Sequence, residues 1–250
     1  MERKLSRELM DDPHVDRAEL AQSLVYLRWV NARLGGAAAL IGHLRRWSAC
    51  WPRAGAGVVT MVDVATGSAD VPVAARRWAL GQGFDLRIVG IDVHESTLEE
   101  ADGFVREASR ADPRIGEGIE LRRADARELV EQFGANSFDY THAGLFLHHL
   151  PDIEVLTVLR IMDRLSKRGL VWSDLHRSRL HRAVAKLFVA GKPEIVRHDA
   201  VVSFEAGFTG REVREIARRV GVAGWTRYRR APLWYRFTLA GERPGAWELP

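Results

Sequence analysis

The chain of 250 residues contains a single cysteine, Cys50, which excludes an internal disulfide bond and a metal site built from thiolates. Its longest apolar stretches, VVTMVDVA and GGAAALIG, fall well short of the roughly 20 residues needed to cross a bilayer. No basic and apolar leader opens the sequence. We therefore expect a cytoplasmic protein without stable membrane anchoring.

Blocks of like charge are also absent. The formal net charge is only +4, and acidic and basic residues are interspersed along the chain, so we do not expect a nucleic acid as partner. Hydrophobic residues make up 46% of the chain and charged residues 28%, which suits a globular domain with a sizeable core.

The first part of the chain differs in pattern from the rest. Apolar residues recur at three- and four-residue steps within residues 1–47, which predicts helices. A turn-rich segment, CWPRAGAG, follows. We expect an N-terminal helical cap over residues 1–50 and one larger domain over residues 51–250, with a helical insert at about residues 175–207. The apolar stripe of the cap consists of Leu20, Leu24, Leu27, Val30 and Leu34.

From residue 58 onward, strand patterns alternate with helix patterns. Strands are predicted at residues 58–63, 86–92, 119–122, 137–144 and 169–174, and helices at residues 71–80, 96–110, 153–165, 175–191 and 209–220. Continuous apolar strands separated by helices indicate an α/β fold with a parallel sheet covered on both faces. The segment WTRYRRAPLWYRFTLAGE predicts a final antiparallel hairpin.

Small residues join the first strand to the first helix in the segment VDVATGSADVP. Asp63 ends the strand, Asp70 is positioned to cap the helix, and Pro72 suits the first helical turn. Ser96 and Thr209 are predicted to cap later helices, each with a glutamate three residues on. Small side chains let a ligand approach the backbone of the first turn, and the helix N-terminus there favours an anionic group.

Acidic residues stand at the ends of the first three strands, at Asp63, Asp92 and Asp125. In an open parallel sheet the carboxyl ends of the strands face a common ligand crevice. Three carboxylates buried there without partners would be costly, so we expect them to bind a ligand. Asp92 is placed to accept hydrogen bonds from two ribose hydroxyls, and Asp125, beside Ala126, from the amino group of adenine.

In this order, the motifs resemble those of the class I S-adenosylmethionine-dependent methyltransferases. VDVATGSAD is similar to the glycine-rich first motif, IVGIDVHESTLEEA to the second, ELRRADARELV to the third and SFDYTHAGLFLHHLPD to the fourth. The resemblance runs over residues 58–174 and is greatest to members that act on small phenolic or quinol molecules. It implies a Rossmann-like sheet of seven strands, mostly parallel with a C-terminal antiparallel hairpin, and S-adenosyl-L-methionine as cofactor.

The resemblance also implies which residues contact the cofactor. They are Asp63, Ala65, Thr66, Gly67, Ser68, Asp70, Asp92, Val93, Asp125, Ala126, Ala143 and Gly144. The family usually has glycines where Ala65 and Ala69 stand here. Alanine resists positive φ angles, so either these two positions have ordinary backbone angles or cofactor binding is weakened. We expect ordinary angles.

Methyl transfer to a phenol requires a deprotonated oxygen, and a phenol with a pKa near about 10 is scarcely ionised at neutral pH. Histidine suits the role of base. His148 and His149 follow the fourth strand and are the leading candidates, and His176 follows the fifth, whereas His181 and His198 are expected at the surface. The sequence implies no metal, although Mg²⁺ bound by aspartates at strand ends stays open.

The predicted function is O-methylation of a small phenolic or polyketide-like acceptor, with specificity set by residues 1–47 and 175–207. C-methylation of an aromatic or quinol ring would use nearly the same residues. A NAD-dependent oxidoreductase would share the sheet but should carry G-x-G-x-x-G, which ATGSAD does not fit. A non-catalytic nucleoside-binding module would keep the three acids and need no acceptor pocket. The sequence leaves a homodimer open.

Overall fold

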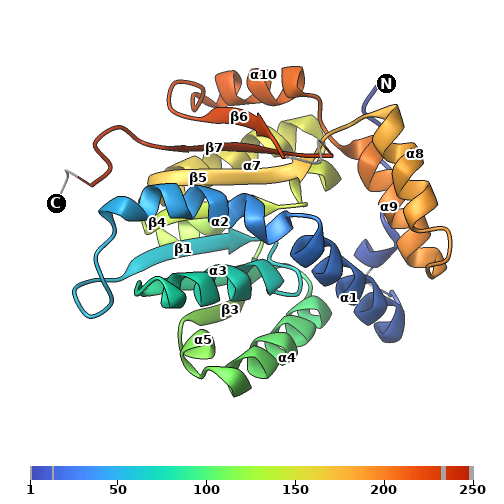
Figure 1. The fold of residues 1–250 in the computed structure, drawn as a ribbon. Coiled ribbons are helices and arrows are strands. Elements are labelled where there is room, and N and C mark those ends of the chain that lie inside the picture. The colour runs from blue at the N-terminus through green and yellow to red at the C-terminus, as the bar shows by residue number, and fades with distance from the viewer. Residues whose placement is uncertain (1, 13, 232–234, 248–250) are drawn as a thin grey trace.

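The computed structural model describes residues 2–12, 14–231 and 235–247, and its centre is a seven-stranded sheet in the order β3-β2-β1-β4-β5-β7-β6 (Figure 1). The strands are β1 (Val59–Val64), β2 (Leu86–Asp92), β3 (Ile119–Arg123), β4 (Phe138–Gly144), β5 (Ser166–Leu175), β6 (Arg227–Arg230) and β7 (Arg236–Glu242). The first five strands are parallel, and β7 runs antiparallel to both β5 and β6. This confirms the predicted α/β, Rossmann-like sheet with its C-terminal hairpin. Residues 232–234, which follow β6 and precede β7 in the chain, lie outside the described residues.

Helices cover both faces of the sheet. They are α1 (Arg17–Arg33), α2 (Gly36–Trp47), α3 (Asp70–Gly81), α4 (Glu95–Ala111), α5 (Arg114–Glu117), α6 (Leu129–Phe133), α7 (Asp152–Leu165), α8 (Arg179–Phe188), α9 (Glu194–Ala206) and α10 (Gly210–Val220). Successive strand residues point to opposite faces, so Met61 packs with α2 and α3, whereas Val62 packs with α7 and α10. The apolar strands of the sequence are therefore buried on both sides, as parallel strands require.

Two of the three predicted helix caps differ in the structure. Thr209 and Glu212 form the expected capping box. Helix α4 instead begins after His94, because the Asp92 carboxylate accepts the His94 N–H at 3.1 Å and so fixes the turn before Ser96. Asp70 is the first residue of α3 rather than its cap, which is Ala69.

The segment predicted as one helix over residues 175–191 is shorter and has a second helix after it. Strand β5 continues to Leu175, where it pairs with Arg236 of β7, so α8 starts only at Arg179. Helix α9 lies within the helical insert predicted at about residues 175–207, although no separate helix was assigned to residues 192–206. It contacts both α1 and α8, and Figure 1 shows these helices gathered beyond the end of the sheet toward which β1 points.

None of the described helices combines the length and the apolar character needed to cross a bilayer.

Candidate functional site

A cavity of about 930 Å³ lies at the carboxyl ends of the parallel strands and is lined by residues from β1, β2, β4 and β5, and from α1, α8 and α9. Its position is the crevice at which open α/β sheets bind ligands. Its volume is at the upper end of the roughly 300–1,000 Å³ typical of ligand pockets, which gives room for a nucleoside-sized cofactor together with a second small molecule.

All three carboxylates predicted at strand ends line this cavity. Asp63 is buried and accepts hydrogen bonds from Thr66 Oγ1 at 2.7 Å and from the His142 ring at 2.5 Å. Asp125 lies in the loop after β3, where Arg127 Nε at 2.9 Å holds the carboxylate and its guanidinium lowers the pKa of Asp125. The sheet thus brings together three acids that are far apart in the sequence.

Asp92, at the end of β2, forms a hydrogen bond with the turn that follows β1. Its carboxylate accepts the backbone N–H of Gly67 and that of His94, each at 3.1 Å. Burial raises the pKa of Asp92 above its usual range, and the backbone hydrogen bonds offset only part of this effect. A buried carboxylate in this position gains from further donors, such as the hydroxyls of a ribose.

The turn after β1 corrects the expectation about its alanines. Ala65 and Ala69 have φ angles of 55° and 56°, and Gly67 has a φ of 55°, so all three adopt left-handed backbone conformations. Ordinary angles would break the turn that directs the Gly67 N–H toward Asp92 and lets Thr66 N–H donate to Ile91. The alanines therefore keep the path that glycine usually provides, at a cost of roughly 1–2 kcal/mol each.

We expect Ala65→Gly to raise the free energy of unfolding by about 0.5–1 kcal/mol, because relief of the left-handed strain exceeds the added entropy of the unfolded chain. Urea unfolding monitored by circular dichroism measures the change. Ala126→Gly is the matched control, since Ala126 lines the same cavity without a positive φ, and it should lower stability. An equal decrease in the free energy of unfolding of both variants would contradict the backbone strain at Ala65.

Four residues that line the cavity carry a buried polar atom with no hydrogen-bond partner within the described residues. These atoms are Nε2 of His142, Oγ of Ser173, Oγ of Ser23 and Nε of Arg236. Gly67 adds open space, because a Cβ built there would meet no atom within 4 Å. Buried polar groups are nearly always paired, so these atoms and the open turn fit a ligand that carries polar groups of its own.

Two residues predicted at the site lie elsewhere, and a third lies closer than expected. Ala143 is buried in the hydrophobic core, because successive strand residues point to opposite faces and those that line the cavity are His142 and Gly144.

His176 does not line the cavity. It forms a β-bridge with Phe208, and its ring lies 3.4 Å from the Tyr228 hydroxyl. Burial lowers the pKa of His176 to about 4. His181, expected at the surface, does line the cavity. All the other predicted cofactor residues do as well.

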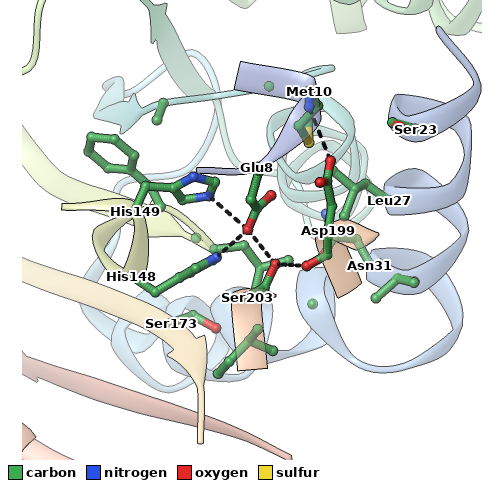
Figure 2. A pocket seen from close by; sticks show the side chains of 18 of the residues that line it. Glu8, Met10, Ser23, Leu27, Asn31, His148, His149, Ser173, Asp199 and Ser203 are labelled. Atoms are coloured by element: carbon green, nitrogen blue, oxygen red, sulfur yellow. Dashed lines mark hydrogen bonds and ion pairs between the residues drawn. The ribbon is translucent and has the colours of Figure 1, made fainter. Parts of the chain in front are cut away.

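His148 and His149 both line the cavity, where both rings face Glu8 (Figure 2), and each ring is held through Nδ1 by a further carboxylate. His148 Nδ1 lies 2.7 Å from Asp174, and His149 Nδ1 lies 2.7 Å from Asp11. The Nε2 atoms turn toward Glu8, at 3.3 Å from His148 and 3.8 Å from His149. The side chain of His149 is 21% exposed, whereas that of His148 is 3% exposed, so His149 is the more accessible ring.

Opposite charges on Glu8 and His149 stabilise the ionised form of each residue. Burial alone would raise the pKa of Glu8, but the charge of His149 and the hydrogen bond from His148 outweigh it and lower the pKa to about 2. Burial alone would lower the pKa of His149, but the charges of Glu8 and Asp11 outweigh it and raise the pKa to about 10. The protein by itself therefore places positive charge on an imidazole at the cavity wall.

Glu8 was missed at the sequence level, because it lies 140 residues from His148 and belongs to no motif. Asp199 of α9 holds its segment by accepting the N–H groups of Leu9 at 2.7 Å and Met10 at 3.1 Å. Arg3 fixes the same segment to the loop after β4 by donating to the carbonyl of His148 at 3.0 Å. The N-terminal segment is thus part of the cavity wall.

The remaining wall is apolar and comes from α1, α8 and α9. Its members are Leu24, Leu27, Val30, Leu34, Leu180, Val184, Phe188, Val196 and Phe204. Four of them belong to the leucine-rich stripe predicted on the first helix. Leu180, Val184 and Phe188 are also 45–68% exposed, so α8 offers an apolar edge at the mouth of the cavity.

Comparison with known families and structures is consistent with this geometry. Residues 61–169 match the family model described as a methyltransferase domain. No curated protein sequence matches the chain significantly.

Three solved structures similar to this chain are described as methyltransferases. Magnesium protoporphyrin IX methyltransferase from Synechocystis PCC 6803, with bound SAH, is 15% identical with a TM-score of 0.55, covering 94% of this chain and 91% of that one. An O-methyltransferase family protein from Burkholderia thailandensis is 15% identical with a TM-score of 0.58, covering 88% and 59%. An O-methyltransferase family 2 protein from Planctomyces limnophilus DSM 3776, in complex with apigenin, is 14% identical with a TM-score of 0.51, covering 74% and 50%.

The three similar proteins differ in how much of their own length this chain covers. The chain spans half to three fifths of the length of the last two proteins and nine tenths of the first. At identities this low, the comparisons show a shared fold.

Proposed function

We propose that this protein, whose residues 61–169 match the model of a methyltransferase domain, transfers a methyl group from S-adenosyl-L-methionine to the oxygen of a small phenolic or polyketide-like acceptor. One observation carries the proposal: the strained turn and three carboxylates form one wall of a cavity whose opposite wall is apolar. The apigenin complex of a structural neighbour is in keeping with a phenolic acceptor.

The polar wall fits the parts of S-adenosyl-L-methionine. Asp92 would accept hydrogen bonds from the ribose hydroxyls, and Asp125 with Ala126 would hold the adenine. Asp63 and the turn would hold the methionine portion. The turn residues are Ala65, Thr66, Gly67, Ser68 and Asp70, with Val93 and Gly144 completing the wall. When bound, the cofactor supplies an electrophilic methyl group.

The apolar wall fits an aromatic or alkyl-bearing acceptor. Leu27 of α1 and Val184 of α8 would pack against its ring, and burial of such surface contributes about 25 cal/mol per Å². Ser173 Oγ, buried without a partner within the described residues, would bind a polar substituent of the acceptor. Alignment of the reacting atoms between the two walls is the main task, since proximity supplies roughly 7–11 kcal/mol in favourable reactions.

His149 would act on the acceptor oxygen. Its Nδ1 is held by Asp11 at 2.7 Å, so Nε2 is the ring nitrogen left to face an acceptor. An imidazole kept positive by Glu8 and Asp11 favours the ionised form of a nearby hydroxyl and balances the charge on its oxygen. The sequence suggested a neutral histidine that removes the proton, whereas the role proposed here is that of a positively charged histidine that stabilises the ionised acceptor. Both roles fall to His149.

Calorimetry with S-adenosylhomocysteine and with NAD tests the cofactor. We expect the first to bind in the micromolar range and NAD not to bind. Binding of NAD alone would identify an oxidoreductase instead.

Incubation with methyl-labelled cofactor and a panel of phenols tests the reaction, and NMR of the product distinguishes O- from C-methylation, which nearly the same residues would serve. Binding of S-adenosylhomocysteine without turnover on any phenol or quinol would favour a non-catalytic nucleoside-binding module.

A further inference from the structure

Two histidines and a glutamate converge at the acceptor side of the cavity. Figure 2 shows the rings of His148 and His149 both directed at one oxygen of the Glu8 carboxylate, with Ser203 on the other side of that oxygen. One ligand atom from each of the three residues lies within 4.8 Å of the others. The segment before α1 supplies the glutamate and the loop after β4 supplies both histidines, so the group exists only in the folded chain.

The outer hydrogen bonds of the two rings determine which nitrogen is available. Asp174 holds His148 through Nδ1, and Asp11 holds His149 through Nδ1, each at 2.7 Å. Asp174 is itself fixed by N–H donors from Leu175 at 2.8 Å and from the Trp172 ring at 3.1 Å. Metal-binding histidines nearly always donate their second ring N–H to such a carboxylate, which orients the ring and makes the other nitrogen a better ligand.

We propose that Glu8, His148 and His149 bind a divalent transition-metal ion, with Zn²⁺ as the best-fitting class. Imidazole nitrogens with one carboxylate suit Zn²⁺ and Fe²⁺, whereas Mg²⁺ and Ca²⁺ favour all-oxygen sites. Donor atoms around a tetrahedral Zn²⁺ at about 2.1 Å lie about 3.4 Å apart. The Glu8 oxygen lies 3.3 Å from His148 Nε2 and 3.8 Å from His149 Nε2, so only small movements are needed.

The charge around the rings favours a cation. Three carboxylates, those of Glu8, Asp11 and Asp174, contact the two imidazoles. With only three protein ligands and a position on the cavity wall, the site has the pattern of a catalytic rather than a structural metal centre. With Zn²⁺ bound, His149 would be a neutral ligand, and the open coordination position rather than its Nε2 would face the acceptor oxygen and lower the pKa of that hydroxyl, a role that rests on the proposed function.

Titration of the chelator-treated protein with ZnCl₂ alone, followed by calorimetry, tests the site. We expect one Zn²⁺ per chain, and a visible absorption spectrum when Co²⁺ replaces it. Zinc X-ray absorption on the wild-type protein should show two imidazole nitrogens at about 2.0–2.1 Å. This measurement does not depend on any variant folding.

Single variants assign the ligands. Glu8→Gln and His149→Ala should weaken Zn²⁺ binding by at least about 100-fold, and Asp11→Asn, which loosens only the ring orientation, by about 10–100-fold. His181→Ala is the matched control, because it removes a histidine from the same cavity outside the group, and it should bind Zn²⁺ as the wild type does.

Absence of stoichiometric Zn²⁺ binding, an unchanged affinity in Glu8→Gln, or an equal loss in His181→Ala would overturn the proposal. S-adenosylhomocysteine titrations on the same samples keep the two proposals apart. Zn²⁺ binding without S-adenosylhomocysteine binding would refute the proposed function alone. The reverse result would refute the metal site alone.

Discussion

Asp92→Ala should abolish measurable binding of S-adenosylhomocysteine. The buried carboxylate would accept two ribose hydroxyls, and each hydrogen bond to a charged group contributes about 1.5–3 kcal/mol, so the loss corresponds to about 10²–10⁴-fold in affinity. Calorimetry measures it, with circular dichroism to confirm the fold, because Asp92 also accepts the N–H groups of Gly67 and His94. Asp102→Ala, on the exposed side of α4, is the matched control and should bind as the wild type does.

The raised pKa of Asp92 adds a pH dependence to this prediction. The ionised carboxylate accepts both hydroxyls, so binding is fully present above its pKa and is lost as the pH falls through it. Because burial raises that pKa above the ordinary value of 3.8, affinity should begin to decline at a higher pH than it would for a carboxylate with the ordinary pKa. Asp92→Asn should bind more weakly and lose this dependence. An equal decline in Asp92→Asn would assign the effect to other groups.

The polar wall of the cavity, proposed to hold the cofactor, was predictable because its sequence signals are local. Each of Asp63, Asp92 and Asp125 stands at the end of an apolar strand, and parallel strands bring such ends to one edge. The prediction for Ala65 and Ala69 was wrong because backbone propensity is a weak constraint: hydrogen bonds that close the turn, including that from Gly67 to Asp92, outweigh the strain of two alanines.

The acceptor side could not be predicted in the same way. Glu8 reaches the histidine pair only because α9 holds the N-terminal segment through Asp199, and no periodicity marks such a long-range contact. His176 was misplaced because β5 extends further than its apolar run suggests, so this histidine leaves the sheet beside Phe208 rather than at the cavity. Helix α9 lies in the predicted helical insert, but its own bounds were not predicted because its apolar residues do not form a clear single stripe.

His149→Ala should lower the rate of methyl transfer by about 10²–10³-fold, the usual cost of removing one group that stabilises charge on a reacting oxygen. The affinity for S-adenosylhomocysteine should stay unchanged, because His149 lines the cavity but is not among the residues proposed to hold the cofactor. Single-turnover rates with the best acceptor of the phenol panel, set beside calorimetric affinities, separate the two effects. His198→Ala, a partly exposed histidine outside the cavity, is the control.

The comparison with His148 sharpens this result. His148 is buried between Asp174 and Glu8, so His148→Ala would leave two carboxylates without their partner and should lower stability as well as rate. His149→Ala leaves Glu8 paired with His148 and Ser203, and its thermal unfolding should stay close to that of the wild type. If His148→Ala lowered the rate and His149→Ala did not, the two histidines would serve the fold of the loop after β4, and the acceptor oxygen would contact neither ring.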